Sequence, residues 1–438
     1  MKRLNQTAWG NYPKLNSDVF SPPFYSVSIP DECFIPQGNL RSYGDCALAP
    51  SAVSMLNHNK IISLDLEKGL INCQAGCLFS DILDLILPKG YFLPVTPGTK
   101  YITVGGAIAS DVHGKNHHID GSFSAHIHSF CLLLPDGTEK TCSKEEHSEL
   151  FWLTCGGMGL TGIILSAKFY LRNVQSSFIS QTSIKAPSLK NVMELFETHA
   201  DQRYSVAWID CLSKGKNLGR SVFMVGDHSP VSDLSVKQQK QPFLVKEKQL
   251  KVPFYFPKRS LNTFSVKAFN FAYYYKQLKR QVESVVDYNT FFYPLDSILE
   301  WNKIYGKPGF VQYQCVIPYE KSYEGMKALL THISDRGMGS FLAVLKLFGE
   351  QNTLMGFPMK GYTLALDFPI TKALFPFLDE LDKIVLKYGG RLYLTKDARM
   401  SKTMFLESYP NAKTFFSLLE HYVPGKKVQS LQSKRLGY

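Results

Sequence analysis

The chain has 438 residues, a formal net charge of +12, and a composition that is 45% hydrophobic and 13% aromatic. The apolar content excludes a disordered or fibrous protein, and the length favours two domains over a single core. No stretch approaches the ~18 apolar residues that span a bilayer, and the opening MKRLNQTAWGNYP has no apolar signal-peptide core, so we expect a cytoplasmic protein.

The first loop with a functional pattern runs from Pro36 to Asp45 and holds two glycines, a serine and an arginine. A short strand is predicted over Ile61–Leu64. Leucine and isoleucine then recur at helical spacing from Phe79 to Leu87, and Pro88-Lys89-Gly90 is expected to end that helix.

A second loop follows in the stretch GTKYITVGGAIASDVHGKNHH, from Gly98 to His118. Tyr101–Val104 reads as a strand that ends on Gly105-Gly106, and the small residues 107–110 allow a helix to begin there. Glycines let main-chain N–H groups approach an anion, and the positive end of a helix favours the same anion. The pattern predicts a bound diphosphate; a tight turn without a ligand is the alternative.

The third glycine-rich loop, Cys155–Gly162, leads directly into a strand over Ile163–Leu165. None of the three loops has the GxGxxG or GxxxxGK[ST] pattern of common nucleotide-binding motifs. One extended nucleotide cofactor threaded between all three loops is the simplest common explanation.

The later part of the chain alternates strand-like and helical segments, which is typical of a sheet with helices on one face. Strands are expected at 222–225, 311–317 and 362–368, and helices at 189–199, 322–333 and 375–387.

A basic segment from Lys237 to Arg259 contains seven cations, one acid (Glu247) and several aromatic and aliphatic residues. A solvated loop is one interpretation. The other is a flap that contacts phosphate head groups or an anionic membrane surface, which makes peripheral membrane contact a second expectation for the location. We expect no nucleic-acid partner, because no recognised nucleic-acid-binding module accompanies the charge.

The three glycine-rich loops resemble the flavin-binding half of the vanillyl-alcohol-oxidase-type, or PCMH-type, FAD-binding oxidoreductases. The resemblance continues in order through Gln312–Gln314, Leu366–Ile370 and Gly390–Asp397, and is strongest to the branch that oxidises polyprenyl-phosphate-linked pentoses. It implies an α+β, two-domain fold. Residues 1–174 would form the FAD-binding domain, 175–390 a substrate domain of antiparallel sheet covered by helices, and 391–438 the return to the FAD-binding domain.

The resemblance also implies roles for individual residues. Those matching FAD-lining positions are Gly38, Arg41, Ser42, Tyr43, Gly44, Gly98, Thr103, Gly105, Gly106, Ser110, Asp111, His113, Ile163 and Tyr393. Those matching the substrate pocket are Lys115, Trp208, Gln312, Tyr313, Gln314 and Lys346. A core role for Trp208 is the alternative.

Lys396 matches a catalytic lysine and would stabilise the negative charge of the reduced flavin. Tyr43 and His113 would orient or deprotonate the substrate hydroxyl, since histidine suits a base near neutral pH. The alternatives are a surface lysine and a histidine bonded in a turn. No metal site is expected: His113, His117 and His118 lack an obvious further ligand. The nine cysteines have no CxxC pair and should be reduced.

The favoured function is FAD-dependent oxidation of a polyprenyl-phosphate-linked pentose to a keto-sugar, with a separate short-chain reductase completing an epimerisation. A polyol or aldonolactone oxidase and a glycolipid-binding protein without turnover are the alternatives. Many relatives attach FAD to a histidine in the first loop, which Leu40–Tyr43 lacks, so FAD should be bound non-covalently. Thr363 and Ala365 replace an asparagine and a cysteine found in the resembling branch, so the sugar itself could differ.

Overall fold

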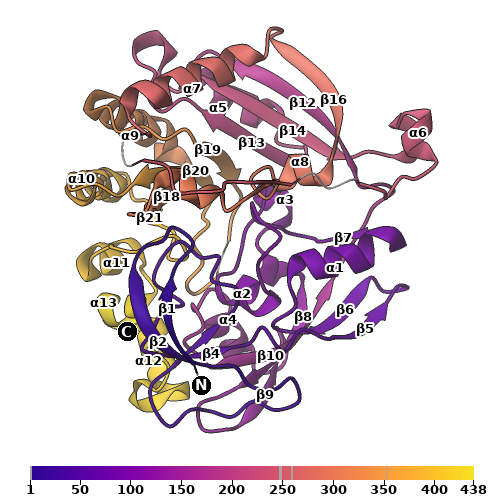
Figure 1. Cartoon of the computed structure of the whole chain (residues 1–438), viewed down its shortest axis with the longest axis vertical. Helices are drawn as coiled ribbons and strands as arrows, with labels where there is room; N and C mark the ends of the chain where they lie inside the picture. The colour runs from indigo at the N-terminus through magenta and orange to yellow at the C-terminus, as the bar shows by residue number, and fades with distance from the viewer. Residues whose placement is uncertain (1, 246–248, 258–259, 352) are drawn as a thin grey trace.

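The computed structural model describes residues 2–245, 249–257, 260–351 and 353–438. The chain forms a lower half and an upper half in the view of Figure 1. Among the expected basic residues, Lys246, Lys248, Lys258 and Arg259 lie outside the described residues, as does Glu247. No described helix combines the length and apolar character needed to cross a lipid bilayer.

The lower half is built on two small sheets. The first has the order β1-β2-β4-β3, formed by Lys2–Thr7, Lys14–Phe20, Ser51–Ser54 and Ile35–Gln37. The second has the order β5-β6-β10-β8-β9, formed by Ile61–Asp65, Leu70–Gln74, Ile163–Tyr170, Ile127–Leu133 and Glu139–Cys142. Its helices are α1 (Phe79–Ile86), α2 (Val104–Ala109), α3 (His117–Asp120) and α4 (Ser148–Thr154), and β7 (Tyr91–Phe92) pairs with β11 (Arg172–Asn173).

The upper half is one eight-stranded sheet in which every neighbouring pair is antiparallel. Its order is β16-β12-β14-β13-β19-β20-β18-β21, formed by Gln281–Asp287, Phe178–Ala186, Ser221–His228, Tyr204–Ile209, Ala343–Phe348, Gly361–Pro369, Phe310–Pro318 and Arg391–Leu392. Three helices cover one face, α5 (Leu189–Thr198), α9 (Ser322–Arg336) and α10 (Leu374–Lys387). The family fold predicted from the sequence is confirmed.

The remaining elements lie between β14 and β18 in the chain. They are α6 (Val236–Gln239), β15 (Leu250–Lys251), α7 (Thr263–Lys276), α8 (Tyr288–Phe292) and β17 (Ile298–Leu299). Of these, β15 and β17 pair in parallel.

Local sequence explains most of the element boundaries. In α10, buried Leu374, Leu378, Leu381 and Val385 recur at the helical period and face the sheet. Helix α9 extends three residues beyond the expected end at Ile333, to Arg336. Gly337 caps it with a φ of 66°, a conformation that glycine adopts without the steric cost of a Cβ.

One predicted strand is wrong. Tyr101–Val104 was expected to be extended, but only Thr103 forms an isolated bridge, with Leu78, and Val104 begins α2. The Thr103 hydroxyl accepts a hydrogen bond from the Gly106 amide at 3.1 Å and so caps the helix. The β-branched residues that suggest a strand, Thr103 and Val104, therefore form the N-cap and the first residue of α2.

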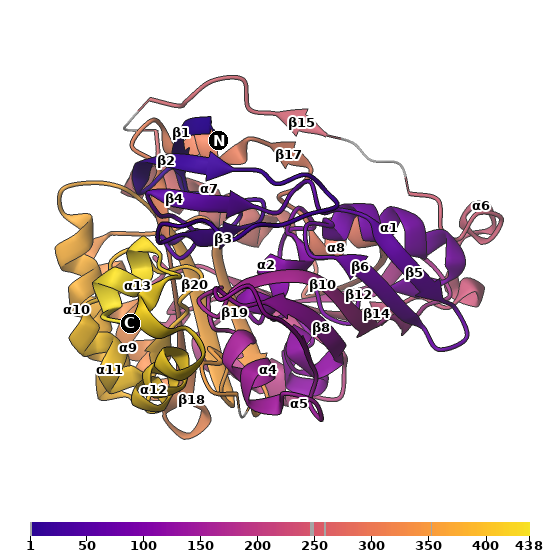
Figure 2. The same ribbon diagram turned by 90° about the horizontal axis from the view of Figure 1, so that it is seen from below.

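The C-terminal segment returns to the lower half, where both chain ends lie (Figure 1). Arg391 and Leu392 still pair with the large sheet, so the return starts just beyond the expected point. Helix α11 (Lys402–Ser408) then packs against α10, α12 (Ala412–Tyr422) against α4, and α13 (Leu431–Leu436) against α11; the view from below shows these three helices around the C-terminus (Figure 2). Arg435 of α13 contacts Asp45 at 2.7 Å and Asp397 at 2.9 Å, which ties the last helix to the first glycine-rich loop.

Candidate active site

A cavity of about 1100 Å³ lies between the two halves. It is lined by the three glycine-rich loops on one side and by residues of β13, β14, β18, β19 and β20 on the other. Pockets for a single small ligand are about 300–1000 Å³. The cavity is therefore large enough for an extended cofactor with a substrate beside it.

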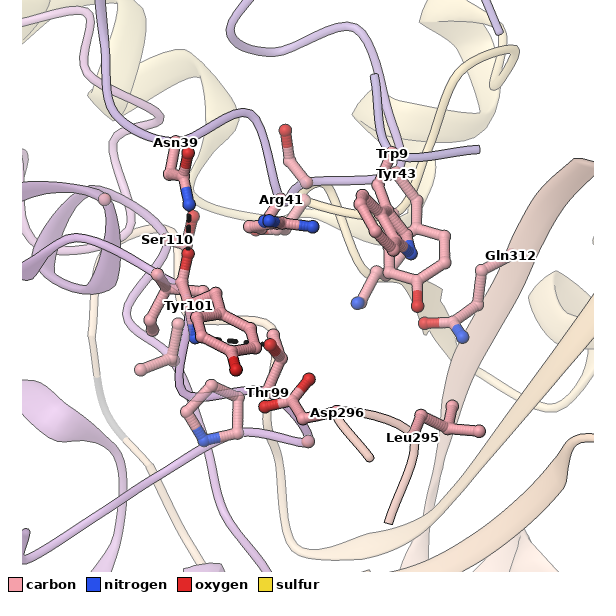
Figure 3. Close-up of a pocket in the computed structure, with 18 of the residues that line it drawn as sticks. Trp9, Asn39, Arg41, Tyr43, Thr99, Tyr101, Ser110, Leu295, Asp296 and Gln312 are labelled. Carbon is pink, nitrogen blue, oxygen red and sulfur yellow. Dashed lines mark hydrogen bonds between the residues drawn. The ribbon is translucent and has the colours of Figure 1, made fainter. Parts of the chain in front are cut away.

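Most residues predicted to line a cofactor do line this cavity. They come from separate segments of the chain and are Gly38, Arg41, Ser42, Tyr43, Gly98, Thr103, Gly105, Gly106, Ser110, His113 and Tyr393. Several of them appear in Figure 3, where Arg41 and Ser110 lie on one side of the opening and Tyr43 lies opposite Gln312.

The glycines in these loops have distinct reasons for lacking a side chain. A Cβ on Gly38 would lie 2.2 Å from Thr103 Oγ1, so this glycine lets the first and second loops touch. A Cβ on Gly98 or Gly159 would meet no protein atom within 4 Å, although both glycines line the cavity. Protein packing therefore does not require a glycine at either position: Gly98 leaves open space, and at Gly159 the φ of 78° itself favours glycine.

The backbone of the loops is also unusual. Leu40, Asp111 and Met158 adopt positive φ values of 49°, 39° and 53°, although none of them is glycine. Such conformations cost free energy and cluster at ligand-binding sites. Each of the three loops carries one of them, which supports one shared ligand.

Arg41 is the main cation at the loop end of the cavity. Its guanidinium carbon lies 4.2 Å from the centre of the Trp9 ring and 5.6 Å from that of Tyr101. Its Nε atom is buried and has no hydrogen-bond partner among the described residues. Burial lowers the pKa of Arg41, while nearby Asp296 raises it. A buried cation with a free donor in an open cavity suits an anionic ligand.

Tyr313 does not line the cavity, contrary to expectation. Successive side chains of a strand point to opposite faces, and its neighbours Gln312 and Gln314 face the cavity. The Tyr313 hydroxyl donates instead to Asp382 of α10 at 3.0 Å, on the helix-covered face. Its role is structural.

Gly44, Asp111 and Ile163 also lie behind the cavity wall. A Cβ on Gly44 would lie 1.9 Å from the carbonyl oxygen of Asp397, so this glycine allows close backbone packing. The Asp111 carboxylate is buried and accepts hydrogen bonds from a main-chain amide and a glutamine side chain. Ile163 faces the core, and the next residue along the strand, Ile164, lines the cavity in its place.

The predicted catalytic residues Lys396, Tyr43 and His113 all line this cavity. The Lys396 ammonium lies 3.9 Å from the centre of the Tyr43 ring. Gln312 Nε2 donates to Asp367 Oδ1 at 2.6 Å, while Asp367 Oδ2 is buried with no hydrogen-bond partner among the described residues. Burial lowers the pKa of Lys396 to about 7 and raises that of Asp367 to about 7, and each charge favours the other.

His113 is held on both ring nitrogens. Lys346 Nζ lies 3.4 Å from its Nδ1, and Gln314 Nε2 lies 3.2 Å from its Nε2. Burial, together with the nearby cation of Lys346, keeps the pKa of His113 well below its usual value. The ring is therefore neutral near pH 7, and its nitrogens are engaged by protein groups.

Two lysines give the cavity an uncompensated positive charge. Lys115 Nζ donates to the Phe291 carbonyl and lies 4.3 Å from the centre of the Phe291 ring. No described carboxylate forms an ion pair with Lys115 or Lys346. Burial lowers the pKa of Lys115 to about 7, with a further contribution from Lys346, and burial lowers the pKa of Lys346 to about 8.

An apolar wall lies next to these lysines. The Trp208 indole N–H donates to the Phe341 carbonyl at 3.1 Å, and the Trp208 ring lies 4.5 Å from that of Tyr273. Met224 and Phe269 continue the wall. Trp208 is thus both a buried packing residue and part of the cavity lining, so its two expected roles coincide.

The remaining histidines and the cysteines have separate environments. His117 Nε2 lies 2.7 Å from Gln351 Oε1, and His118 Nε2 lies 2.9 Å from the Gln202 carbonyl oxygen. Within the described parts of the chain, no group of three or more His, Cys, Asp or Glu could hold a metal ion. All nine cysteines are free.

Several cavity residues were not predicted from the sequence, among them Trp9, Asp296 and Asp367. Trp9 and Asp296 have no local signal, because tertiary packing alone brings them to the first two loops. Asp367 did have a local signal. It lies two residues after Ala365 on β20, and side chains two residues apart on a strand share a face.

Comparison with known proteins gives consistent results. The FAD binding domain family matches residues 30–143. The chain is 36% identical over 411 residues, 92% of this chain and 88% of the other, to decaprenylphosphoryl-beta-D-ribose oxidase of Mycolicibacterium smegmatis. It is 30% identical over 368 residues, 81% of this chain and 98% of the other, to an uncharacterised protein of Streptomyces coelicolor. L-gulonolactone oxidase of Mus musculus is 27% identical over 149 residues, 34% of this chain and 32% of its own.

Proposed function

Since the chain belongs to the FAD-binding oxidoreductase family of decaprenylphosphoryl-beta-D-ribose oxidase, we propose that it oxidises a hydroxyl group of a polyprenyl-phosphate-linked pentose to a ketone. The protein is an FAD-dependent oxidoreductase. When bound, FAD supplies a ring that accepts the hydride of the alcohol carbon, and the residues around it bind, orient and deprotonate the substrate.

The loop end of the cavity fits this cofactor. Gly98 and Gly159 leave space that no protein atom fills, and the buried Nε donor of Arg41 would face the diphosphate. Gly38 and Gly105 serve the packing of the loops around this space: a Cβ on Gly105 would lie 3.1 Å from the Ala75 Cβ, and the Gly105 amide donates to the Ala75 carbonyl at 2.8 Å.

The observation that carries the substrate proposal is the pair Lys115 and Lys346. Two partly buried cations without a carboxylate partner favour an anionic ligand, since a phosphate would restore the charged form of both. The apolar wall at Trp208 lies in the same cavity and would accommodate the first isoprenoid units. A free polyol would leave both lysines uncompensated.

We further propose that Asp367 accepts the hydroxyl proton. Burial raises its pKa to about 7, while neighbouring Gln312, Lys396 and Tyr305 lower it, and this value suits a base at neutral pH. Lys396, as the ammonium, would stabilise negative charge on the cofactor, while Tyr43 stays protonated because burial raises its pKa well above the usual value. His113 would orient the site through its bonds to Lys346 and Gln314.

The test is product analysis with purified protein, FAD and an artificial electron acceptor. We expect a short-chain polyprenyl-phosphate pentose to be converted to a product lighter by one pair of hydrogens, which mass spectrometry detects. Free pentose, polyol and aldonolactone should give little product. Preferential turnover of the polyol or the aldonolactone would contradict the proposal, and turnover of none of these compounds would favour a binding protein.

A ketone product implies a second enzyme. Reduction of the ketone from the opposite face inverts the carbon, so we propose that a separate short-chain reductase completes an epimerisation. Adding such a reductase with its reduced nicotinamide to the untreated reaction should convert the ketone into the epimeric pentose. Recovery of only the original pentose would contradict this part of the proposal.

A further inference from the structure

Helix α7 has two apolar sides. Its inner side places Phe269 and Tyr273 in the cavity wall, and buries Val266 and Tyr274 against the sheet. A helix that is apolar on all sides is expected to be covered on all sides. Most of the outer side of α7 is exposed; among the described residues, Lys185 and Arg220 lie over Tyr275 near its C-terminal end.

The outer side carries a regular aromatic stripe. Phe264, Phe271 and Tyr275 are 81%, 58% and 47% exposed, and they follow one another at helical spacing. Leu278, just beyond the helix, is 92% exposed. Figure 1 shows α7 at the outer margin of the upper half. An exposed patch of this kind marks an interaction site.

The charged residues of the α7 segment itself are all basic. Residues 260–282 contain no Asp or Glu, and their cations are Lys267, Lys276, Lys279 and Arg280. All four are exposed. Aromatic side chains mixed with lysines are typical of surfaces that lie in the head-group region of an anionic bilayer.

We propose that the outer side of α7 docks this protein on an anionic lipid bilayer. Phe264, Phe271 and Tyr275 enter the head-group region, and the lysines contact acidic lipids. A second copy of the chain is a poor occupant, because pairing two α7 helices would oppose Lys267 and Lys276 with like charges.

Helix α7 lies between the proposed bilayer surface and the cavity. The same helix lines the cavity on its inner side, so a bilayer on its outer side would lie next to the apolar end of the active site. A lipid-linked sugar could then pass from the membrane to the cavity without crossing water. This part of the inference rests on the proposed function.

The test is flotation of the FAD-bound full chain with vesicles of phosphatidylcholine alone and of phosphatidylcholine with phosphatidylglycerol. We expect binding to the anionic vesicles only. The variant Phe264→Ser/Phe271→Ser/Tyr275→Ser should lose binding on the order of tenfold or more, since affinity scales with buried apolar area. The matched control is Phe24→Ser/Tyr25→Ser, which removes two aromatics that are 53% and 77% exposed elsewhere.

Three results would overturn the docking proposal: absence of wild-type binding, undiminished binding by the α7 variant, or equal loss in the control. Light scattering provides a fourth, a wild-type dimer that the α7 variant converts to a monomer. Flavin reduction by the short-chain substrate is measured in parallel and should be unchanged in the α7 variant. Reduction without vesicle binding overturns docking alone, whereas vesicle binding without reduction overturns the proposed function alone.

Discussion

The ammonium group of Lys396 lies 3.9 Å from the centre of the Tyr43 ring, which brings a residue near the C-terminus onto a residue of the first glycine-rich loop. The Tyr43 and Gly44 amides both donate to the Thr395 carbonyl, at 3.1 and 3.2 Å, so the contact is fixed by the backbone. The C-terminal return therefore completes the active site as well as the fold.

Lys396→Met should reduce the rate constant of anaerobic flavin reduction by about 100-fold or more, since it removes the cation placed for developing charge. The variant should still bind FAD. Stopped-flow absorbance gives the rate, and Lys216→Met, which changes an exposed lysine, is the control. An undiminished rate in Lys396→Met would remove this residue from the mechanism.

The pH profile of flavin reduction should be bell-shaped with a maximum near 7. The active form needs ionised Asp367 and protonated Lys396, whose pKa values are raised and lowered to about 7 by burial. The two limbs belong to the pair rather than to either residue alone. A rate independent of pH between about 5.5 and 9 would contradict the assignment.

Asp367→Asn separates the two limbs. We expect the loss of the acidic limb and a lower maximum rate, because the proton acceptor is gone. The alkaline limb should move to lower pH, since the carboxylate no longer raises the pKa of Lys396. A shift of that limb to higher pH would show that Lys396 does not sense Asp367.

Gly98→Val should fold but bind FAD poorly. A Cβ at this position meets no protein atom within 4 Å, so the added side chain takes space only from the ligand. Flavin fluorescence titration of the apoprotein should show an affinity loss of about tenfold or more, with a smaller loss for Gly98→Ala. An unfolded variant, identified by circular dichroism, would mean that the glycine is structural.

Binding of a short-chain polyprenyl phosphate should take up protons at pH 8. Lys115 and Lys346 have pKa values of about 7 and 8, and a phosphate raises both. Affinity should therefore weaken as pH rises from about 7 to 9. Calorimetry in buffers of different ionisation enthalpy measures the uptake, which Lys346→Met should reduce; equal heats in all buffers would contradict phosphate contact.

FAD should leave the denatured protein. The first loop offers no histidine, burial raises the pKa of cavity-lining Cys46 to about 12, and His113 is bonded on both nitrogens. The Cys46 thiol and the His113 ring are therefore poor nucleophiles in this environment. Acid precipitation followed by filtration should release all of the yellow colour, and colour retained with the polypeptide would show a covalent bond.

The sequence predicts those parts of the site that have a local cause. Glycine-rich loops are recognisable from local composition. Gly38, Gly98 and Gly105, which the sequence predicts as cofactor-lining residues, all line the cavity. Trp9 and Asp296 reach the cavity only through tertiary packing and leave no local trace.

The errors have equally specific causes. Thr103 was read as part of a strand because its β-branched side chain favours one, yet its hydroxyl caps α2. Tyr313 was grouped with Gln312 and Gln314, although three consecutive residues of a strand cannot share a face.

The most direct measurement is anaerobic mixing of the FAD-bound protein with a short-chain polyprenyl-phosphate pentose while the visible absorbance of the oxidised flavin is recorded. We expect complete bleaching with the phosphorylated lipid sugar and far slower bleaching with the free pentose. Bleaching by the free sugar as fast as by its lipid phosphate would contradict the account, because Lys115 and Lys346 would then have no part in choosing the substrate.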